Sequence, residues 1–252
     1  MTLLRLEALT KDFGELRAVD KCSFEVAAHA IQGLIGPNGS GKTTVFNMIT
    51  GFLKPTAGRV FFKDRDITGW QPHEVSDAGI ARTFQLVRVF RRMTVLENLL
   101  NGAKDQVGEK LLAGTVALPP VRREEKRHLE RAWDLLSVIG LDKYANEYCG
   151  DLPYAEQKMV ELTRALMSEP ELILLDEPTS GINPTLVNQI LDYIRKLRTE
   201  RGMTFLVVEH DMRVIMGLCD RIVVLNYGEK IAEGTPAEIS RDRGVIDAYL
   251  GV

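Results

Sequence analysis

Residues 36–43 read Gly-Pro-Asn-Gly-Ser-Gly-Lys-Thr. This stretch fits the pattern G-x-x-x-x-G-K-[ST], in which a glycine-rich turn follows a strand and opens a helix. A strand is expected at 31–35, directly before the glycine cluster, and the spacing of apolar residues in 43–49 predicts the helix. Glycines let the backbone curl so that successive N–H groups point inward at phosphate oxygens. The stretch therefore predicts a phosphate-binding loop.

The parts of this loop have separate tasks. The following helix adds partial positive charge at its N-terminus, Lys42 places a full charge on the β- and γ-phosphates, and the Thr43 hydroxyl can ligate Mg²⁺. The structural alternative is a plain glycine-rich turn. At average composition, a chain of this length would match the four fixed positions of the motif by chance roughly one time in a hundred. We expect the following residues to bind the nucleotide: Gly36, Pro37, Asn38, Gly39, Ser40, Gly41, Lys42, Thr43 and Thr44.

Two adjacent carboxylates follow a second apolar run. Residues 172–175 predict a strand buried on both faces, and Asp176 and Glu177 come directly after it. The carboxyl ends of parallel strands are where α/β sheets bind ligands. Asp176 can hold Mg²⁺ through water, and Glu177 can reach past it toward an attacking water, which fits nucleotide hydrolysis. The alternative is a helix cap, and the phosphate loop makes that alternative weak.

His210 and Gln85 also follow predicted strands. His210 ends the run FLVVEH, and although a lone histidine is more often structural, this position favours a contact with the γ-phosphate. Gln85, in RTFQ, closes a short strand, and by itself a glutamine there means little.

Short β-branched runs alternate with longer helical patterns along the chain, which indicates an α/β fold with a largely parallel sheet. Further strands are expected at 4–8, 22–26, 205–208 and 222–225, and further helices at 124–139, 156–167 and 186–198. Residues 86–166 differ in character, with long helical patterns and the interruption LLAGTVALPP. We expect one domain over 1–252, with a core of 1–85 and 167–252 and a helical subdomain at 86–166. The charged run 122–127 interleaves Arg and Glu, which is typical of a solvated helix face.

Composition excludes several classes of protein. The 252 residues include 32 basic and 35 acidic side chains, a net charge of -3, whereas coating nucleic acid needs a clustered basic excess. The longest uncharged stretch, 26–41, contains Pro, Asn, Ser and several glycines, so it is not a membrane span. The 3 cysteines are unclustered, which argues against a disulfide framework or a zinc site.

The motifs GPNGSGKT, RTFQ, LILLDEP and VVEHD, in this order, resemble the ATP-binding cassette of ABC transport ATPases. The resemblance covers essentially the whole chain. It implies an ATPase with ATP and Mg²⁺ as cofactors. The implied fold is that of a P-loop NTPase: a RecA-like, mostly parallel sheet core, an N-terminal antiparallel β subdomain and an inserted α-helical subdomain that carries the signature motif.

Carried over position by position, the resemblance implies roles for individual residues. Glu177 looks like the general base, His210 like the switch histidine, and Gln85 like the glutamine that senses Mg²⁺ and water and faces the transmembrane partner. Phe13 looks like the aromatic that stacks on adenine; the alternative is a core phenylalanine. Residues 180–183 look like the loop that contacts the opposite subunit, although the family more often has Asp where Asn183 stands. The expected metal ligands are Thr43, Gln85 and Asp176.

Longer segments narrow the resemblance to one subgroup. RTFQLVRVFRRMTVLENLL, EHDMRVIMGLCDRIVVLNYGEKIAEGTP and the ending VIDAYLG resemble the ATPase subunits of branched-chain amino-acid importers. That subgroup carries a longer insert before the signature motif, and this chain has one at about 103–123. Urea and short-amide importers share most of these features. A lipid or lipopolysaccharide exporter is disfavoured by the insert and by the L-P-Y-A sequence.

The signature motif departs from the family pattern L-S-G-G-Q, because residues 152–157 read Leu-Pro-Tyr-Ala-Glu-Gln. In this family two cassettes dimerise head to tail, and the signature of one caps the γ-phosphate held by the other. We expect Pro153, Tyr154, Ala155 and Glu156 to face that nucleotide. A missing serine hydroxyl removes a hydrogen bond to charged phosphate, worth about 1.5–3 kcal/mol. Ala155 adds a methyl group where the backbone must approach closely, which glycine would tolerate better. The site capped by this chain is expected to be weakened; the competing interpretation is that the subgroup tolerates the change.

The resemblance also implies partners. We expect two transmembrane permease subunits, a second cassette subunit that makes a heterodimer in the assembled importer, and indirectly a substrate-binding protein, with no nucleic acid. The chain would then lie peripherally on the cytoplasmic face of the membrane.

Two other functional classes stay open. A cassette acting on DNA or the ribosome usually has two cassettes, coiled-coil insertions or zinc-binding cysteines, and a regulatory module without turnover would not need Asp176, Glu177 and His210.

Overall fold

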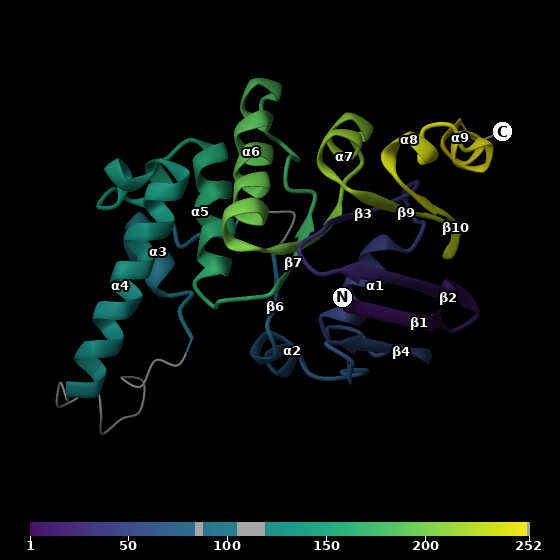
Figure 1. Cartoon of the computed structure of the whole chain (residues 1–252), viewed down its shortest axis with the longest axis horizontal. Coiled ribbons are helices and arrows are strands. Elements are labelled where there is room, and N and C mark those ends of the chain that lie inside the picture. The colour runs from purple at the N-terminus through teal and green to yellow at the C-terminus, as the bar shows by residue number, and fades with distance from the viewer. Residues whose placement is uncertain (84–87, 105–118, 251–252) are drawn as a thin grey trace. The chain divides into compact units, whose positions relative to one another are not determined.

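The computed structural model describes residues 1–83, 88–104 and 119–250 (Figure 1). The chain divides into two compact units. The first comprises Met1–Gln85 and Glu171–Val252, and the second is Leu86–Pro170. Within the described ranges, every helix is too short or too polar to cross a lipid bilayer.

A six-stranded sheet is the centre of the first unit, with the strand order β10-β9-β3-β8-β7-β6. All neighbours in it pair in parallel except β10 and β9. Its strands are β3 (Ile31–Ile35), β6 (Ile80–Arg82), β7 (Leu172–Asp176), β8 (Thr204–Val208), β9 (Arg221–Asn226) and β10 (Glu229–Gly234). The predicted strands at 31–35, 172–175, 205–208 and 222–225 are confirmed, each within one residue at either end.

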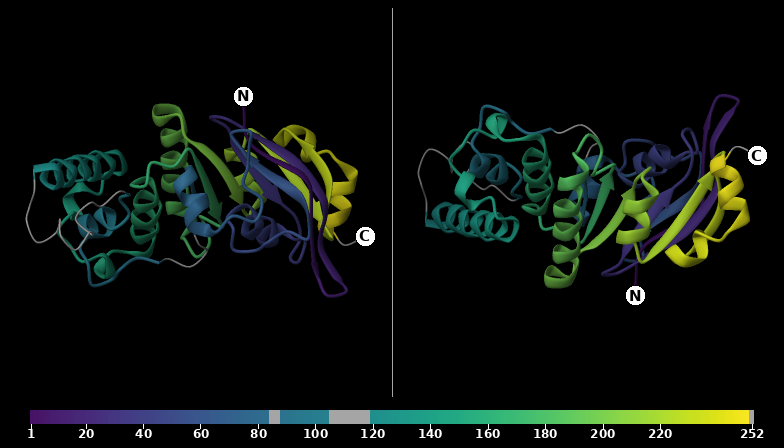
Figure 2. Two further views of the ribbon diagram at one scale, coloured as in Figure 1. Left: turned by 90° about the horizontal axis from the view of Figure 1, so that it is seen from below. Right: turned by 90° about the horizontal axis from the view of Figure 1, so that it is seen from above.

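The three central strands are covered on both faces, since every residue of β3, β7 and β8 is buried. A strand in that position is mostly apolar, which explains why residues 172–175 and 205–208 read as apolar runs without alternation. The buried polar residues Gln32 and Thr204 are exceptions. Helices α6 (Pro184–Arg201) and α7 (Met212–Leu218) lie over one face of the sheet, and α1 (Lys42–Ile49) lies on the other (Figures 1 and 2).

The strands β3, β8 and β7 end level with one another. Leu34 pairs with Val208, and Val208 pairs in turn with Asp176. Because all three strands are parallel, the segments that follow them leave the sheet at the same edge. The register therefore brings Gly36, Glu177 and Glu209, which are far apart in sequence, to one edge of the sheet.

A four-stranded antiparallel sheet in the order β2-β1-β4-β5 packs against α1. Its strands are β1 (Thr2–Phe13), β2 (Leu16–Ala27), β4 (Ala57–Phe62) and β5 (Arg65–Asp66). Phe46 of α1 is fully buried in the core shared with this sheet. The predicted strands 4–8 and 22–26 are parts of 12-residue strands, because bulges with positive φ at Ala8 and Lys21 interrupt the alternation.

The second unit is helical, with α3 (Val95–Leu100), α4 (Pro119–Ile139) and α5 (Tyr154–Leu166). Its fully buried Asn98 donates to the carbonyl oxygens of Phe90 and Thr94 at 3.0 and 2.9 Å, which fixes the turn before α3. The predicted helices 124–139 and 156–167 are confirmed, although α4 begins five residues earlier. Of the predicted insert 103–123, residues 105–118 lie outside the described residues.

Three short helices complete the first unit. They are α2 (Pro72–Ala78), α8 (Pro236–Ile239) and α9 (Arg243–Leu250).

Candidate functional site

The loop between β3 and α1 is fastened at its middle. Ser40 is buried, and its carbonyl oxygen accepts a hydrogen bond of 3.2 Å from the N–H of Gly228, in the turn between β9 and β10. The Gly228 carbonyl in turn accepts from the N–H of Asp20 in β2 at 2.9 Å. The two sheets of the first unit therefore hold the loop between them.

Two glycines of the loop are required by close contacts. Gly41 has a φ of +99°, and a Cβ there would lie 2.6 Å from the carbonyl oxygen of Ala18. Gly36 has a φ of +152°, and a Cβ there would overlap the carbonyl group of Leu225. Any other residue at either position would strain the backbone and displace a neighbouring strand. The glycines of the motif thus have a structural cause that is independent of any ligand.

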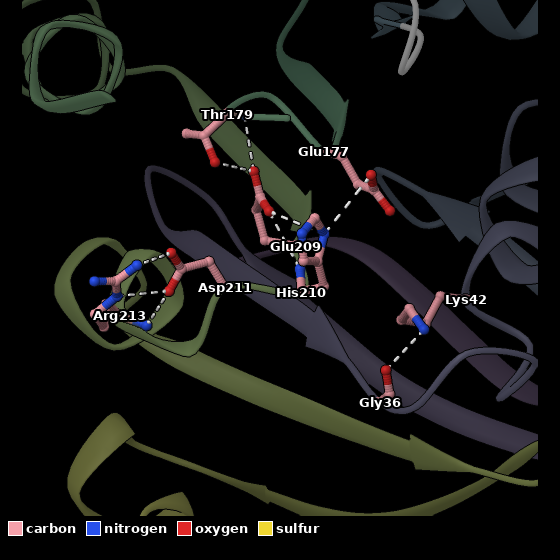
Figure 3. Close-up of polar contacts among 8 residues, drawn as sticks. All are labelled: Gly36, Lys42, Glu177, Thr179, Glu209, His210, Asp211 and Arg213. Atoms are coloured by element: carbon pink, nitrogen blue, oxygen red, sulfur yellow. Dashed lines mark hydrogen bonds and ion pairs between the residues drawn. The ribbon is translucent and has the colours of Figure 1, made fainter. Parts of the chain in front are cut away.

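Lys42 lies across the loop (Figure 3). Its Nζ donates to the carbonyl oxygens of Gly36 and Pro37, both at 2.8 Å. Burial lowers the pKa of Lys42, while the nearby carboxylates of Glu177 and Asp176 oppose that shift. The helix α1 begins at Lys42, and its N-cap Gly41 offers no side-chain cap. The loop thus combines a cation with the uncapped positive end of a helix.

Asp176, the last residue of β7, is held by a buried ion pair. The Arg82 guanidinium contacts Oδ2 of Asp176 at 2.8 Å, and the two side chains are only 8% and 12% exposed. Arg82 also donates to Oδ1 of Asn47 in α1 at 2.6 Å. Arg82 therefore fixes the Asp176 carboxylate beside α1. No role is predicted for Arg82 from the sequence motifs, although a charged residue in a strand next to a buried strand signals a buried partner.

Glu177 stands in a strained backbone conformation directly after β7. Its φ is +48°, a region that residues other than glycine rarely adopt. Its N–H donates to the Val208 carbonyl at 2.9 Å, and this hydrogen bond attaches the turn after β7 to the end of β8. The Nδ1 of His210, whose side chain is 64% exposed, lies 3.7 Å from Oε2 of Glu177. Strain of this kind collects at functional sites, and here it aims a carboxylate at a histidine on the neighbouring loop (Figure 3).

Glu209 is a second residue that sequence reasoning missed. Its side chain is completely buried, and its Oε1 accepts from the Thr179 N–H at 2.8 Å and from the Thr179 hydroxyl at 2.5 Å. Its Oε2 accepts from the His210 N–H at 3.2 Å. The available signal was a charged residue that continues the buried run FLVV.

The remaining predicted residues of the first unit lie as follows. Phe13 ends β1 and is 49% exposed, so it is not a core side chain. Thr43 is exposed and Thr44 half-buried in the first turn of α1. Asn38 and Gly39 are exposed at the tip of the loop, and Asn183 directly precedes α6. Gln85 lies outside the described residues.

The signature residues belong to the second unit, where they open α5. Pro153 is the N-cap, exposed Tyr154 is the first helical residue, and Glu156 places an acid in the first turn. Ala155 is only 5% exposed. Its methyl group is therefore covered and is not presented at the surface. This argues against the expectation that the methyl group obstructs a close approach.

Comparison with known proteins decides the family. The sequence profile of the ABC transporter family matches residues 19–180, more than half of the chain. The chain belongs to the ABC transporter family. A second profile, that of the branched-chain amino acid ATP-binding cassette transporters, matches residues 229–252 of this cassette.

Relatives resemble the cassette over its whole length. The high-affinity branched-chain amino acid transport ATP-binding protein LivG of Salmonella typhimurium is 43% identical over 249 residues, 99% of this chain and 98% of LivG. A crystal structure of the ADP conformation of an ABC transporter cassette is 38% identical, with a TM-score of 0.86 and 100% of both chains covered. A dimeric post-hydrolysis cassette bound to ADP and Pi is 27% identical, with a TM-score of 0.73 over 93% of this chain and 99% of that one. The resemblance inferred from the motifs and the P-loop NTPase fold are thus confirmed.

The Arg82–Asp176 pair leads to a prediction about the stability of the cassette. The Arg82→Met variant would leave the Asp176 carboxylate buried without its ion-pair partner, so we expect the free energy of unfolding to fall by about 3–5 kcal/mol. Urea unfolding measures this loss. Adding Asp176→Asn removes the stranded charge and should restore about half of it. A loss below about 1 kcal/mol for Arg82→Met, the size found for exposed pairs, would contradict the buried pair.

Proposed function

We propose that this cassette is the ATP-binding and ATP-hydrolysing subunit of an importer that takes up branched-chain amino acids through separate permease subunits. One observation carries the hydrolytic part of the proposal. The carboxyl ends of β3, β7 and β8 and the segments that follow them, which carry residues 36–43, the Asp176–Glu177 pair and His210, lie at one edge of the sheet, and this supports a shared site for a nucleotide. A cation, two carboxylates and a histidine around one loop are the groups that phosphoryl transfer to water requires.

The loop fits the triphosphate of ATP. The uncapped N-terminus of α1 offers backbone N–H groups, and the Lys42 ammonium already lies among oxygen acceptors of the loop. Phosphate oxygens would replace those acceptors while meeting the partial positive charge of the helix. The Phe13 ring is half-exposed, and the Lys11 ammonium lies 5.2 Å from its centroid, so a base would stack on the face away from Lys11. These features support the loop residues and Phe13 as the nucleotide contacts.

The donor set also fits Mg²⁺. Within the described ranges, no group of three or more His, Cys, Asp or Glu could hold a metal by itself. Mg²⁺ prefers oxygen ligands and is usually held by one or two protein groups together with substrate phosphates. The Thr43 hydroxyl and the Asp176 carboxylate supply such oxygens, and Gln85 stays a proposed ligand. When bound, the ion would neutralise charge that develops on the phosphates.

The residues divide the chemistry among them. Glu177 would accept a proton from the attacking water, and its strained backbone holds the carboxylate in place. His210, 3.7 Å from Glu177, would donate a hydrogen bond to the γ-phosphate. Lys42 would stabilise the negative charge on the β- and γ-phosphates.

Sequence similarity to known importer ATPases supports branched-chain amino acids as the cargo. The cassette shares 43% identity with LivG over nearly its full length, and residues 229–252 match the profile of the branched-chain amino acid cassettes. In this family the permease and the binding protein contact the cargo, and the ATPase does not. Other amino acids, or urea and short amides, are therefore the alternative cargoes, and identification of the permease that co-purifies with the chain distinguishes them.

The same sequence similarity supports the protein partners proposed for the cassette. We propose two permease subunits, a second cassette packed head to tail as a heterodimer, and indirectly a substrate-binding protein. The relative bound to ADP and Pi is described as dimeric. The chain would then lie on the cytoplasmic face of the membrane and contact it through the permeases.

The Glu177→Gln variant tests the hydrolytic function. It keeps the size of the side chain but removes the proton acceptor, so phosphate release by the assembled complex should fall about a hundredfold or more. The affinity for ATP should stay within about twofold, because Glu177 acts in the reaction and not in binding. Phosphate release and nucleotide titration measure the two quantities. Wild-type turnover in this variant would exclude Glu177 as the base, and absence of turnover in the wild-type complex would favour a regulatory module.

The signature motif gives a second test, with single variants that separate its two departures. Pro153 is exposed and lacks a hydroxyl, whereas the Ala155 methyl is covered. If the missing hydrogen bond weakens the site that this chain caps, Pro153→Ser should raise phosphate release by the complex about tenfold, and Ala155→Gly should leave it within about twofold. No change for Pro153→Ser alone or together with Ala155→Gly would show that this subgroup tolerates the altered motif.

A further inference from the structure

Glu209 is a buried charged residue that the proposed hydrolysis does not use. It follows β8 and precedes His210, and its side chain has no exposed surface. A carboxylate in such a place is costly unless hydrogen-bond donors surround it. Among the described residues, Glu209 accepts hydrogen bonds from the N–H and hydroxyl of Thr179 and from the N–H of His210. The His210 Nδ1 also lies 3.8 Å from Oε2 of Glu209.

These donors belong to two different loops. Thr179 lies two residues beyond Glu177, in a turn closed by a 3.1 Å hydrogen bond from the Ser180 N–H to the Glu177 carbonyl. His210 lies on the loop after β8. One carboxylate oxygen of Glu209 therefore holds the turn that carries Glu177, and the other oxygen holds the backbone of His210 (Figure 3).

The backbone hydrogen bond between the two loops does not by itself hold the segments that carry Glu177 and His210 together. The Glu177 N–H bonds to the Val208 carbonyl at 2.9 Å, which ties the loops at the strand ends. In the described part of the chain, no other backbone hydrogen bond joins the two loops beyond that point. The segments after Glu177 and after Val208 could therefore move apart without disturbing the strand ends. The contacts of Glu209 add a second tie, from Thr179 to His210, so that the segments carrying Glu177 and His210 are held on both sides.

We propose that Glu209 is a positioning residue that sets the separation between Glu177 and His210. The proposal rests on the proposed function, in which these two side chains act on the same γ-phosphate. Glu209 itself does not touch the reacting atoms. Its effect is on the geometry of the catalytic step: a small displacement of a general base reduces the rate of the chemical step far more than it reduces substrate binding.

Two variants weaken the tie at opposite ends. In Glu209→Gln, the amide oxygen can still accept from Thr179, but the NH₂ group then faces the His210 N–H, donor against donor. In Thr179→Val, the hydroxyl is lost while the backbone N–H and the shape of the side chain remain. The matched control is Asp211→Asn, the same carboxylate-to-amide change two residues further on. Asp211 is a partly exposed residue that pairs with Arg213 at 2.9 Å and caps α7.

The experiment measures kcat and KM for ATP, and the midpoint of thermal unfolding, for the cassette assembled with its permeases. We expect Glu209→Gln to lower kcat about tenfold or more, since hydrogen bonds to charged groups are the strong ones, with KM within about twofold. Asp211→Asn should stay within about twofold of wild type in both. Because Glu209→Gln and Thr179→Val weaken the same tie, the double variant should be slower than the slower single variant by no more than about twofold.

The outcomes separate the proposals. Wild-type kcat in Glu209→Gln, or losses in the double variant that multiply, would overturn the positioning role. A parallel loss of kcat, affinity and thermal midpoint would show that Glu209 is only structural and would overturn it too. If Glu209→Gln does not fold, Thr179→Val decides by the same split between kcat and KM. A wild-type complex without turnover would overturn the proposed function itself, and the positioning role with it.

Discussion

The parallel pairing of β3, β8 and β7 is the constraint on which the site depends. Their register is level at the carboxyl ends, so the segments after residues 35, 176 and 208 leave the sheet together. Each of these strands is buried on both faces, which prevents a slip of register without exposing apolar side chains or burying polar ones. The core of the first unit thus determines which functional groups meet. The loops themselves need only hold their residues in local conformations.

Buried charges then fix the side chains at this edge. Arg82 holds Asp176 beside α1, and Glu209 holds the turn after Glu177 against the backbone of His210. A buried ion pair such as Arg82–Asp176 contributes little net stability, because removing charges from water costs about as much as the attraction returns. What the contacts of Asp176 and Glu209 add is a defined geometry, since a buried charge without its donors is strongly disfavoured. In this cassette such contacts surround the residues proposed for catalysis.

The sequence predicted the parts of this arrangement that have a local signal. The glycine-rich loop 36–43 between β3 and α1 follows from its motif, and strands β7 and β8 follow from continuous apolar runs. The N-terminal hairpin was predicted too short because bulges at Ala8 and Lys21 break the period-2 pattern. Helix α4 begins before the predicted start because Pro119 opens it, a position that proline tolerates and that periodicity does not show. The contacts of Arg82 and Glu209 depend on tertiary pairing, which no local pattern carries.

We propose that the three strand ends form one nucleotide site. A crystal structure of the Glu177→Gln variant with ATP and Mg²⁺ tests this site most directly. We expect the triphosphate in the loop 36–43, with its γ-phosphate facing both residue 177 and His210. A nucleotide bound with its γ-phosphate away from these two residues, or bound elsewhere on the chain, would contradict a shared site.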